Sequence, residues 1–139
     1  MISINLIPIE AIKEHKEDLY LLYKKRKYTI SQNQRISFED HCKFVDNHPY
    51  RHWFLVKIKD DLAGAVYIHK DNSIGLNFLN LEESIVGETL KIIFSKFDPL
   101  PPKASVRSTN FFINVSHDDK ELQKILLQLG MTCFQSSFR

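Results

Sequence analysis

Apolar and polar side chains alternate through the middle of the chain, from residue 51 to residue 78. Within 51–59 every second residue falls on the same side, which gives two sets: His52, Phe54, Val56 and Ile58, and Trp53, Leu55 and Lys57. Turn-forming residues at 60–61 and 70–73 separate this segment from two further alternating segments at 62–69 and 74–78. The pattern predicts a meander of three antiparallel strands.

A helical period follows directly, because apolar residues recur at every fourth position from 81 to 97. Asn80 and Glu83 are placed to cap the start of this helix, and the Asp-Pro pair at 98–99 to stop it. The third strand therefore delivers the chain to a helix N-terminus, whose unpaired amides and positive dipole end favour a phosphate. We expect a phosphate-bearing cofactor at this place.

The first 48 residues predict a strand and two helices. Alternation over 2–6 predicts the strand, and Pro8 marks a turn into a helix that begins near Ile9. Residues 29–35 are polar and unpatterned, which is typical of a loop. Ser37 with Asp40 resembles a capping box and opens a short helix that ends before the proline at 49.

The last third of the chain predicts a strand, a helix and a final strand. Residues 111–115 are apolar almost throughout, as in a strand that is covered on both faces. Ser116 and Asp119 are expected to cap a helix with a stripe of leucine and isoleucine, and Gly130 to end it. The loose alternation from Met131 to Phe138 predicts a closing strand.

Composition predicts one globular domain over residues 1–139, with 43% hydrophobic and 26% charged residues. No apolar run approaches the roughly 18 residues of a spanning helix, and the N-terminus lacks a signal-peptide pattern, so we expect a cytoplasmic protein without a membrane partner. A net charge of +2 argues against nucleic acid. Cys42 and Cys133 lack metal-ligand spacing, which predicts reduced thiols and no metal. A homodimer is compatible with this composition.

The order of these elements resembles the GNAT (GCN5-related N-acetyltransferase) family over nearly the whole chain. The likeness rests on the strand 62–68 with its internal glycine, on Ile74-Gly75 after the turn, and on Val115 and Gly130 near the end. Asp119 and Met131 stand where the family has Asn and Phe. It implies a mixed α/β (α+β) fold, in which a mostly antiparallel sheet of six to seven strands is flanked by about four helices. It also implies direct transfer of an acetyl or other acyl group from acyl-CoA to the primary amine of a small molecule.

The resemblance also implies where the ligands bind. In the family the pantetheine arm lies between two splayed strands and the pyrophosphate binds the loop before the next helix, which implies cofactor contacts at Phe78, Leu79, Asn80, Ser84, Ile85, Val86, Gly87, Asn114 and Asp119. The region between the first two helices lines the acceptor site, which implies acceptor contacts at Arg26, Tyr28, Arg35 and His41. Within the family, the segment from Arg26 through His41 to Trp53 most resembles acyltransferases that modify amino groups on nucleotide-linked sugars. The residues that carry this resemblance are Arg26, Ser37, Glu39, Asp40, His41, Phe44, Trp53, Phe54, Leu55 and Val56.

The expected cofactor loop departs from the family's spelling. Glu82 stands where the family has Arg or Gln, Ile85 stands where it has its first Gly, and only Gly87 matches. A carboxylate near a pyrophosphate is repulsive by about 1 kcal/mol at about 4 Å in water, and a branched side chain limits close backbone approach. Two hypotheses stay open: the remaining amides still hold acetyl-CoA, or the fold is a catalytically inactive module that binds a ligand or a protein.

The catalytic groups are also unusual. The family's frequent acid, a tyrosine on the last helix, falls on Leu126, so the leaving thiolate takes its proton from water, Cys133 or another group. Imidazole titrates near neutral pH, which makes His41, His69 and His117 the candidate bases.

Overall fold

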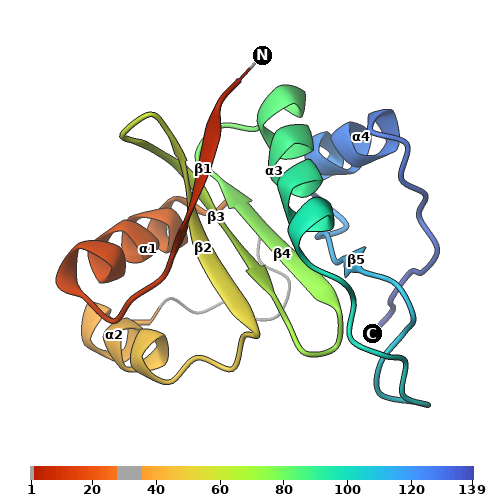
Figure 1. Cartoon of the computed structure of the whole chain (residues 1–139), viewed down its shortest axis with the longest axis horizontal. Helices are drawn as coiled ribbons and strands as arrows, with labels where there is room; N and C mark the ends of the chain where they lie inside the picture. The colour runs from red at the N-terminus through yellow and green to blue at the C-terminus, as the bar shows by residue number, and fades with distance from the viewer. Residues whose placement is uncertain (1, 28–35) are drawn as a thin grey trace.

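A five-stranded sheet with the order β1-β2-β3-β4-β5 forms the centre of the fold in the computed structural model, which describes residues 2–27 and 36–139 (Figure 1). The strands are β1 (Ile4–Pro8), β2 (His52–Ile58), β3 (Asp61–Ile68), β4 (Ser73–Phe78) and β5 (Phe112–Ile113). The helices within the described residues are α1 (Lys13–Lys25), α2 (Phe38–Asp46), α3 (Glu83–Lys96) and α4 (Lys120–Gln128).

The predicted meander is confirmed. β2 pairs antiparallel with β3 and β3 with β4, while β1 joins the other edge of β2, also antiparallel. The two sides of β2 separate as the alternation predicts. Phe54 and Val56 join one apolar cluster, and Trp53 and Leu55 join the other. The remaining pair, β4 with β5, is parallel.

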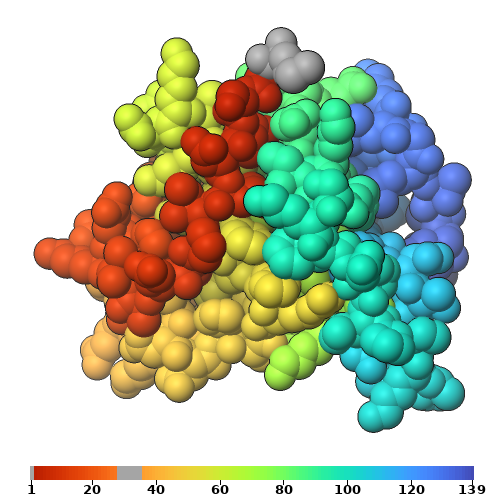
Figure 2. Space-filling view, viewed as in Figure 1, coloured from red at the N-terminus to blue at the C-terminus, as the bar shows by residue number. Residues whose placement is uncertain are grey.

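The sheet therefore has two differently covered faces. The α3 face carries Phe54, Val56, Val66, Ile68 and Ile74 and packs against α3 and α4. The α1 face carries Trp53, Leu55 and Ala65 and packs against α1 and α2. Figure 1 shows the two pairs of helices on opposite sides of the sheet, and Figure 2 shows β1 and α3 side by side on the visible surface.

The sheet has fewer strands than the expected six to seven, because the segment from Met131 to Phe138 forms no strand. Its phenylalanine side chains are exposed to solvent, Phe134 by 68% and Phe138 by 95%. The alternating residues therefore do not bury one side of the segment as they would in a half-buried strand. β5 is also shorter than expected. It holds two residues, both half-buried, rather than a strand covered on both faces.

Two helix starts lie later than expected. β1 runs through Pro8, the Ile9 amide beyond it still donates to the Trp53 carbonyl at 2.9 Å, and α1 begins only at Lys13. The expected capping pair of Asn80 and Glu83 is wrong. The N-cap of α3 is the residue at 82, and its side chain makes no capping hydrogen bond.

The other helix ends follow the sequence more closely. Ser37 caps α2 as expected by accepting a hydrogen bond from the Asp40 amide at 3.1 Å. Asp119 caps α4 by accepting from the amide of residue 122 at 3.1 Å, whereas the side chain of Ser116 takes no part in the cap. Gly130 ends α4 with a φ of +92°, a conformation that glycine adopts without strain.

Asn72, in the turn between β3 and β4, holds the long connection from α3 to β5 in place. Its side chain is fully buried, donates to the carbonyls of Leu100 and Ser108, and accepts from the Leu100 amide at 2.8 Å. Its own carbonyl accepts from the Phe112 amide at 3.2 Å. This one residue therefore sets where β5 meets β4.

Candidate functional site

β4 and β5 pair at their first residues and not beyond. The two pairs are Ser73 with Phe112 and Ile74 with Ile113, after which β5 ends and β4 continues to Phe78. From Gly75 to Phe78 the outer edge of β4 thus has no strand partner among the described residues. We call this stretch the open edge of β4. It offers backbone N–H and C=O groups to a ligand that can pair like a strand.

The open edge leads to the N-terminus of α3. There the amides of Ile85 and Val86 both donate to the Glu82 carbonyl, at 3.1 and 3.0 Å. The amides of Glu83 and Ser84 have no acceptor within 2–27 and 36–139, and both residues are exposed. The amides available to a diphosphate are therefore those of Glu83 and Ser84.

The other expected loop residues serve the core. The Ile85 and Val86 side chains are buried on the α3 face. Gly87 lies inside α3, where a Cβ atom would stand 3.0 Å from Cδ2 of Leu129. Its small size is thus explained by the close approach of the segment that ends α4. The packing against Leu129 therefore gives the glycine at this position a structural explanation.

The remaining residues that we expected to contact the cofactor lie at the end of β4 and after β5. Phe78 ends β4 and packs toward the α3 face, and Leu79 packs toward the α1 face while its amide donates to the Ala63 carbonyl at 2.9 Å. Asn80 is exposed at the end of the strand. Asn114 follows β5 and is exposed, and Asp119 is occupied as the cap of α4.

Six aromatic side chains gather at one end of the α1 face. We call this set the aromatic cluster: Phe44, His48, Tyr50, Trp53, Tyr67 and His69. At its centre the rings of Tyr50 and Tyr67 are stacked, with centroids 4.0 Å apart and planes 7° apart. Trp53 meets Tyr50 edge-on at 5.0 Å. All three rings are half-buried, so the cluster is part of the surface that a ligand can reach.

Tyr67 connects the aromatic cluster to the open edge. A Cβ atom built on Gly75 would lie 2.0 to 2.6 Å from Cε2, Cζ and the hydroxyl oxygen of Tyr67. The outer half of the Tyr67 ring therefore covers the Gly75 backbone directly, and only glycine leaves room for it. Gly75 is also the first residue beyond the last pair of β4 with β5. The phenol thus lies where the open edge begins.

Three solved structures are similar to this chain in overall fold. An aminoglycoside acetyltransferase from an uncultured soil metagenomic sample, determined with sisomicin, superposes with a TM-score of 0.57 at 8% identity, covering 98% of this chain and 93% of that one. The ribosomal L7/L12 alpha-N-protein acetyltransferase RimL gives 0.56 at 16% identity, covering 91% and 80%. A possible acetyltransferase from Clostridium difficile 630 gives 0.54 at 10% identity, covering 98% and 95%.

This chain has the GNAT fold. The expected architecture is therefore confirmed, apart from the number of strands. No known protein family and no curated protein matches the sequence itself. At 8 to 16% identity the structural likeness establishes the fold alone.

Burial is the main reason that the two phenols of the aromatic cluster favour their neutral form. Burial raises the pKa of Tyr50 to about 12, and the neighbouring Tyr67 adds to the rise while the Arg26 guanidinium opposes it. Burial also raises the pKa of Tyr67, where Arg26 again opposes and Asp71 adds to the rise. Arg26 is exposed at the C-terminal end of α1. It is the expected acceptor residue that lies near the cluster, whereas Tyr28 and Arg35 lie outside the described residues.

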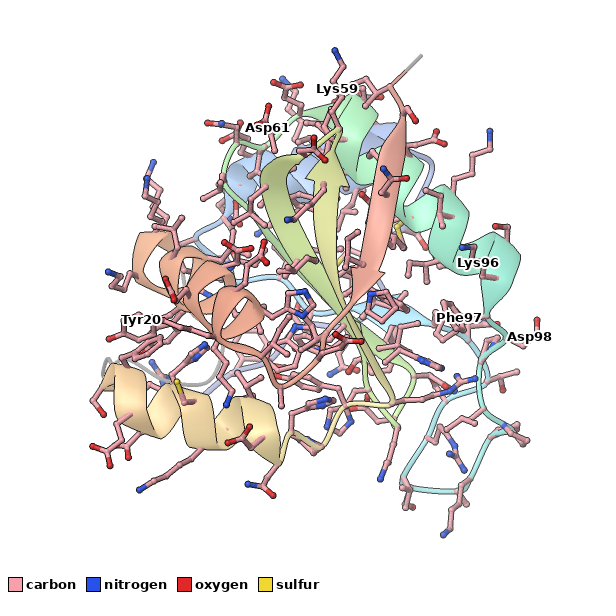
Figure 3. The ribbon with its side chains drawn as sticks, turned by 60° about the vertical axis from the view of Figure 1, so that its left-hand side comes forward. Tyr20, Lys59, Asp61, Lys96, Phe97 and Asp98 are labelled. Atoms are coloured by element: carbon pink, nitrogen blue, oxygen red, sulfur yellow. The ribbon has the colours of Figure 1, made fainter. Side chains whose placement is uncertain are left out.

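The three candidate histidines have different surroundings. His41 is 5% exposed and lies between α1 and α2, 5.2 Å from the ring of Tyr20, which Figure 3 shows on α1 toward α2. Burial lowers its pKa, against the opposing effect of the Lys16 carbonyl. His117 is exposed in the connection from β5 to α4. His69 belongs to the aromatic cluster, with Nδ1 3.6 Å from Oδ1 of Asp71.

Leu126, which stands where the family often has a tyrosine, is 8% exposed and lies in the core of the α3 face. Sequence reasoning missed Tyr50 and Tyr67. The alternation that places Trp53 and Tyr67 on one face was the available signal. Within the described residues, no group of three acidic, histidine or cysteine side chains could hold a metal ion, and no helix is both long and apolar enough to cross a membrane.

Proposed function

We propose that this protein transfers an acyl group, with acetyl as the first candidate, from acyl-CoA to the primary amine of a small molecule. The observation that carries the proposal is the open edge of β4, which leads to the exposed amides of Glu83 and Ser84. The arm of CoA contains two amide groups that can pair with a strand edge, and its diphosphate suits a helix N-terminus. The GNAT fold of three acetyltransferases supports the same function.

The reaction proceeds by direct attack of the amine on the thioester, without an acyl-enzyme intermediate. A backbone amide of the open edge stabilises the developing oxyanion, and the two bound reactants are held in contact. We assign the base to His69 rather than to His41 or His117, because His69 alone among the three belongs to the aromatic cluster. The Asp71 carboxylate lies 3.6 Å from its Nδ1, and its negative charge favours the imidazolium that forms.

The acceptor is an amine that also carries an anionic group. Arg26 provides a cation beside the two phenols, and it forms no ion pair with a described residue. Guanidinium groups bind phosphate in two-pronged geometry, and exposed aromatic faces stack on sugar and base rings. A nucleotide-linked amino sugar has an amine, phosphate groups and rings that can stack. These features favour it over a polycationic acceptor.

Calorimetry with CoA tests this proposal against the alternative of a catalytically inactive module. Glu82 and Ile85 are the residues that support that alternative. We expect measurable binding at millimolar CoA or below, and release of CoA from acetyl-CoA when an amino sugar nucleotide is added. The matched variants are Ser84→Ala, which keeps the backbone amide, and Ser84→Pro, which removes it in a helical turn that tolerates proline.

The alanine variant is expected to bind CoA like the wild type. The proline variant is expected to bind about tenfold more weakly, because a hydrogen bond to a charged oxygen is lost. Equal affinities of the two variants would remove the α3 amides from the site. An absence of heat with all three proteins at millimolar CoA would leave the inactive module as the better description.

A further inference from the structure

We propose that the Tyr67 hydroxyl is a catalytic group that donates a hydrogen bond, and then its proton, to the sulfur of the departing CoA. This inference rests on the proposed function, since it assumes that the CoA arm occupies the open edge of β4. It goes beyond that function by naming the group that receives the leaving thiolate.

The direction of the open edge places the sulfur near Tyr67. A diphosphate at the Glu83 and Ser84 amides lies beyond the C-terminal end of β4, so an arm that follows the edge runs back from Phe78 toward Gly75. The pairing of Ile74 with Ile113 closes the edge at that end. The reactive end of the arm therefore stops at Gly75, which the outer half of the Tyr67 ring covers.

The Tyr67 phenol is held in place and is free to donate. Its ring stacks on Tyr50 at 4.0 Å, which fixes its orientation. Its hydroxyl has no hydrogen-bond partner in the part of the chain that the structure describes, although the side chain is half-buried. Burial raises its pKa above the usual value for tyrosine, so the proton stays on the oxygen at neutral pH. A neutral hydroxyl can donate to a sulfur on which negative charge develops.

The proton transfer balances without another reactant. The amine nitrogen bonds to the thioester carbon, the carbon–sulfur bond breaks, and the electron pair of that bond stays on the sulfur. The Tyr67 proton moves to the sulfur, and the surplus proton of the nitrogen, first taken by the base, restores the phenol. The products are the amide and CoA with a free thiol.

Other groups with a proton to give lie elsewhere. Residue 126 offers only a leucine buried in the core. Cys133 is exposed on the C-terminal segment, where its thiol faces the Gln135 carbonyl at 3.5 Å. The Tyr20 hydroxyl donates to the Ile36 carbonyl at 3.0 Å. Tyr67 is the phenol that lies over the strand along which the arm is proposed to bind.

The test measures the ionisation of the thiol of CoA bound to the protein, followed by thiolate absorbance as pH is raised. It compares the wild type with Tyr67→Phe, which keeps the stacked ring and removes only the hydroxyl. Tyr50→Phe is the matched control, because it removes the other hydroxyl of the same stack. The charged and titratable groups facing Tyr67 are Arg26, Asp71, Tyr50 and, through Tyr50, His69, and both variants leave the charges of Arg26, Asp71 and His69 unchanged.

A hydroxyl that donates to the thiolate favours the charged form and lowers the pKa of the bound thiol. We expect Tyr67→Phe to reduce the thiolate fraction at a fixed pH by about tenfold, and Tyr50→Phe to change it by less than about twofold. Turnover is expected to fall in Tyr67→Phe by about a hundredfold, with little change in the affinity for desulfo-CoA, which lacks the sulfur.

Identical thiol titrations in the wild type and in Tyr67→Phe would overturn the role of Tyr67 while leaving CoA binding intact. A wild type that binds neither CoA nor desulfo-CoA would overturn the proposed function and, with it, this inference. Equal losses of CoA and desulfo-CoA affinity in Tyr67→Phe would show that the hydroxyl maintains the structure of the site and does not interact with the sulfur. This result would also contradict the proposal.

Discussion

The two faces of the same four antiparallel strands differ in what they bury. On the α3 face, Val56, Val66, Ile68 and Ile74 are at most 1% exposed and meet the apolar side of α3. On the α1 face, Leu55 and Ala65 are also buried, but the same strands carry Trp53, Tyr67 and Asn77 there as well, and these three are only partly buried. The alternation of a strand thus lets one face provide stability while its other face keeps polar and aromatic groups accessible.

The accessible groups are held by contacts from α1 and from the loop that follows α2. The Asn77 side chain donates to the Leu22 carbonyl of α1 at 3.2 Å, and Tyr50 follows α2 and stacks on Tyr67. These contacts fix positions without removing the groups from solvent. Substitutions on the α3 face should therefore change stability most, and substitutions on the α1 face should change ligand chemistry most.

The largest expected effect is on the α3 face. Ile74→Ala removes a side chain that is 1% exposed, and we expect the free energy of unfolding to fall by about 3 kcal/mol through lost burial and a cavity. Tyr67→Phe, on the α1 face of the adjacent strand, is expected to change it by less than about 0.5 kcal/mol, because the lost hydroxyl has no partner among the described residues. Denaturant unfolding measures both. Similar losses in the two variants would contradict the division between the faces.

A smaller effect concerns the alkaline stability of the α1 face. Since burial raises the pKa of Tyr50 from 10.0 to about 12, the folded protein favours its neutral ring. The stabilisation is complete below pH 10 and is lost as pH rises through 12, by about 2 kcal/mol in all. The measurement is the difference in unfolding free energy between the wild type and Tyr50→Phe from pH 8 to pH 12. A difference that stays constant over this range would show that Tyr50 titrates normally.

The smallest effect concerns the N-terminus of α3, which follows β4 in the chain. Glu82 is the N-cap of this helix, makes no side-chain capping hydrogen bond, and is exposed directly before Glu83 and Ser84 in the chain. Glu82→Gln removes the repulsion of a diphosphate, and we expect CoA to bind about threefold more tightly at low salt, with a smaller gain at high salt. Calorimetry at two salt concentrations measures this gain. Weaker binding by the glutamine variant would contradict a diphosphate at this helix end.

The fold could be predicted where local patterns dominate. The period of two through β2, β3 and β4 and the change to a helical period in α3 are both present in the structure. The local pattern predicted a closing strand from Met131 to Phe138, and this prediction was wrong. The alternation of this segment is real, but a strand also requires a neighbouring edge and a face to bury, and sequence period reports neither.

The candidate site was less accessible to sequence reasoning. The sequence identifies Gly75 as part of a strand. It does not reveal the contact of Gly75 with Tyr67, because that contact depends on the register of β3 against β4. The stacking of Tyr50 on Tyr67 joins a loop to a strand, which no local pattern encodes. His69 could be named as a candidate from chemistry, but its separation from His41 and His117 required the tertiary structure.

The central claim is that the open edge of β4 receives the arm of CoA, and amide NMR during a CoA titration tests it most directly. We predict that the amide resonances from Gly75 to Phe78, together with those of Glu83 and Ser84, shift progressively and saturate. The amides of β1, at the opposite edge of the sheet, should stay unchanged. Shifts confined to β1 or to the C-terminal segment, with the open edge unaffected at millimolar CoA, would contradict the claim.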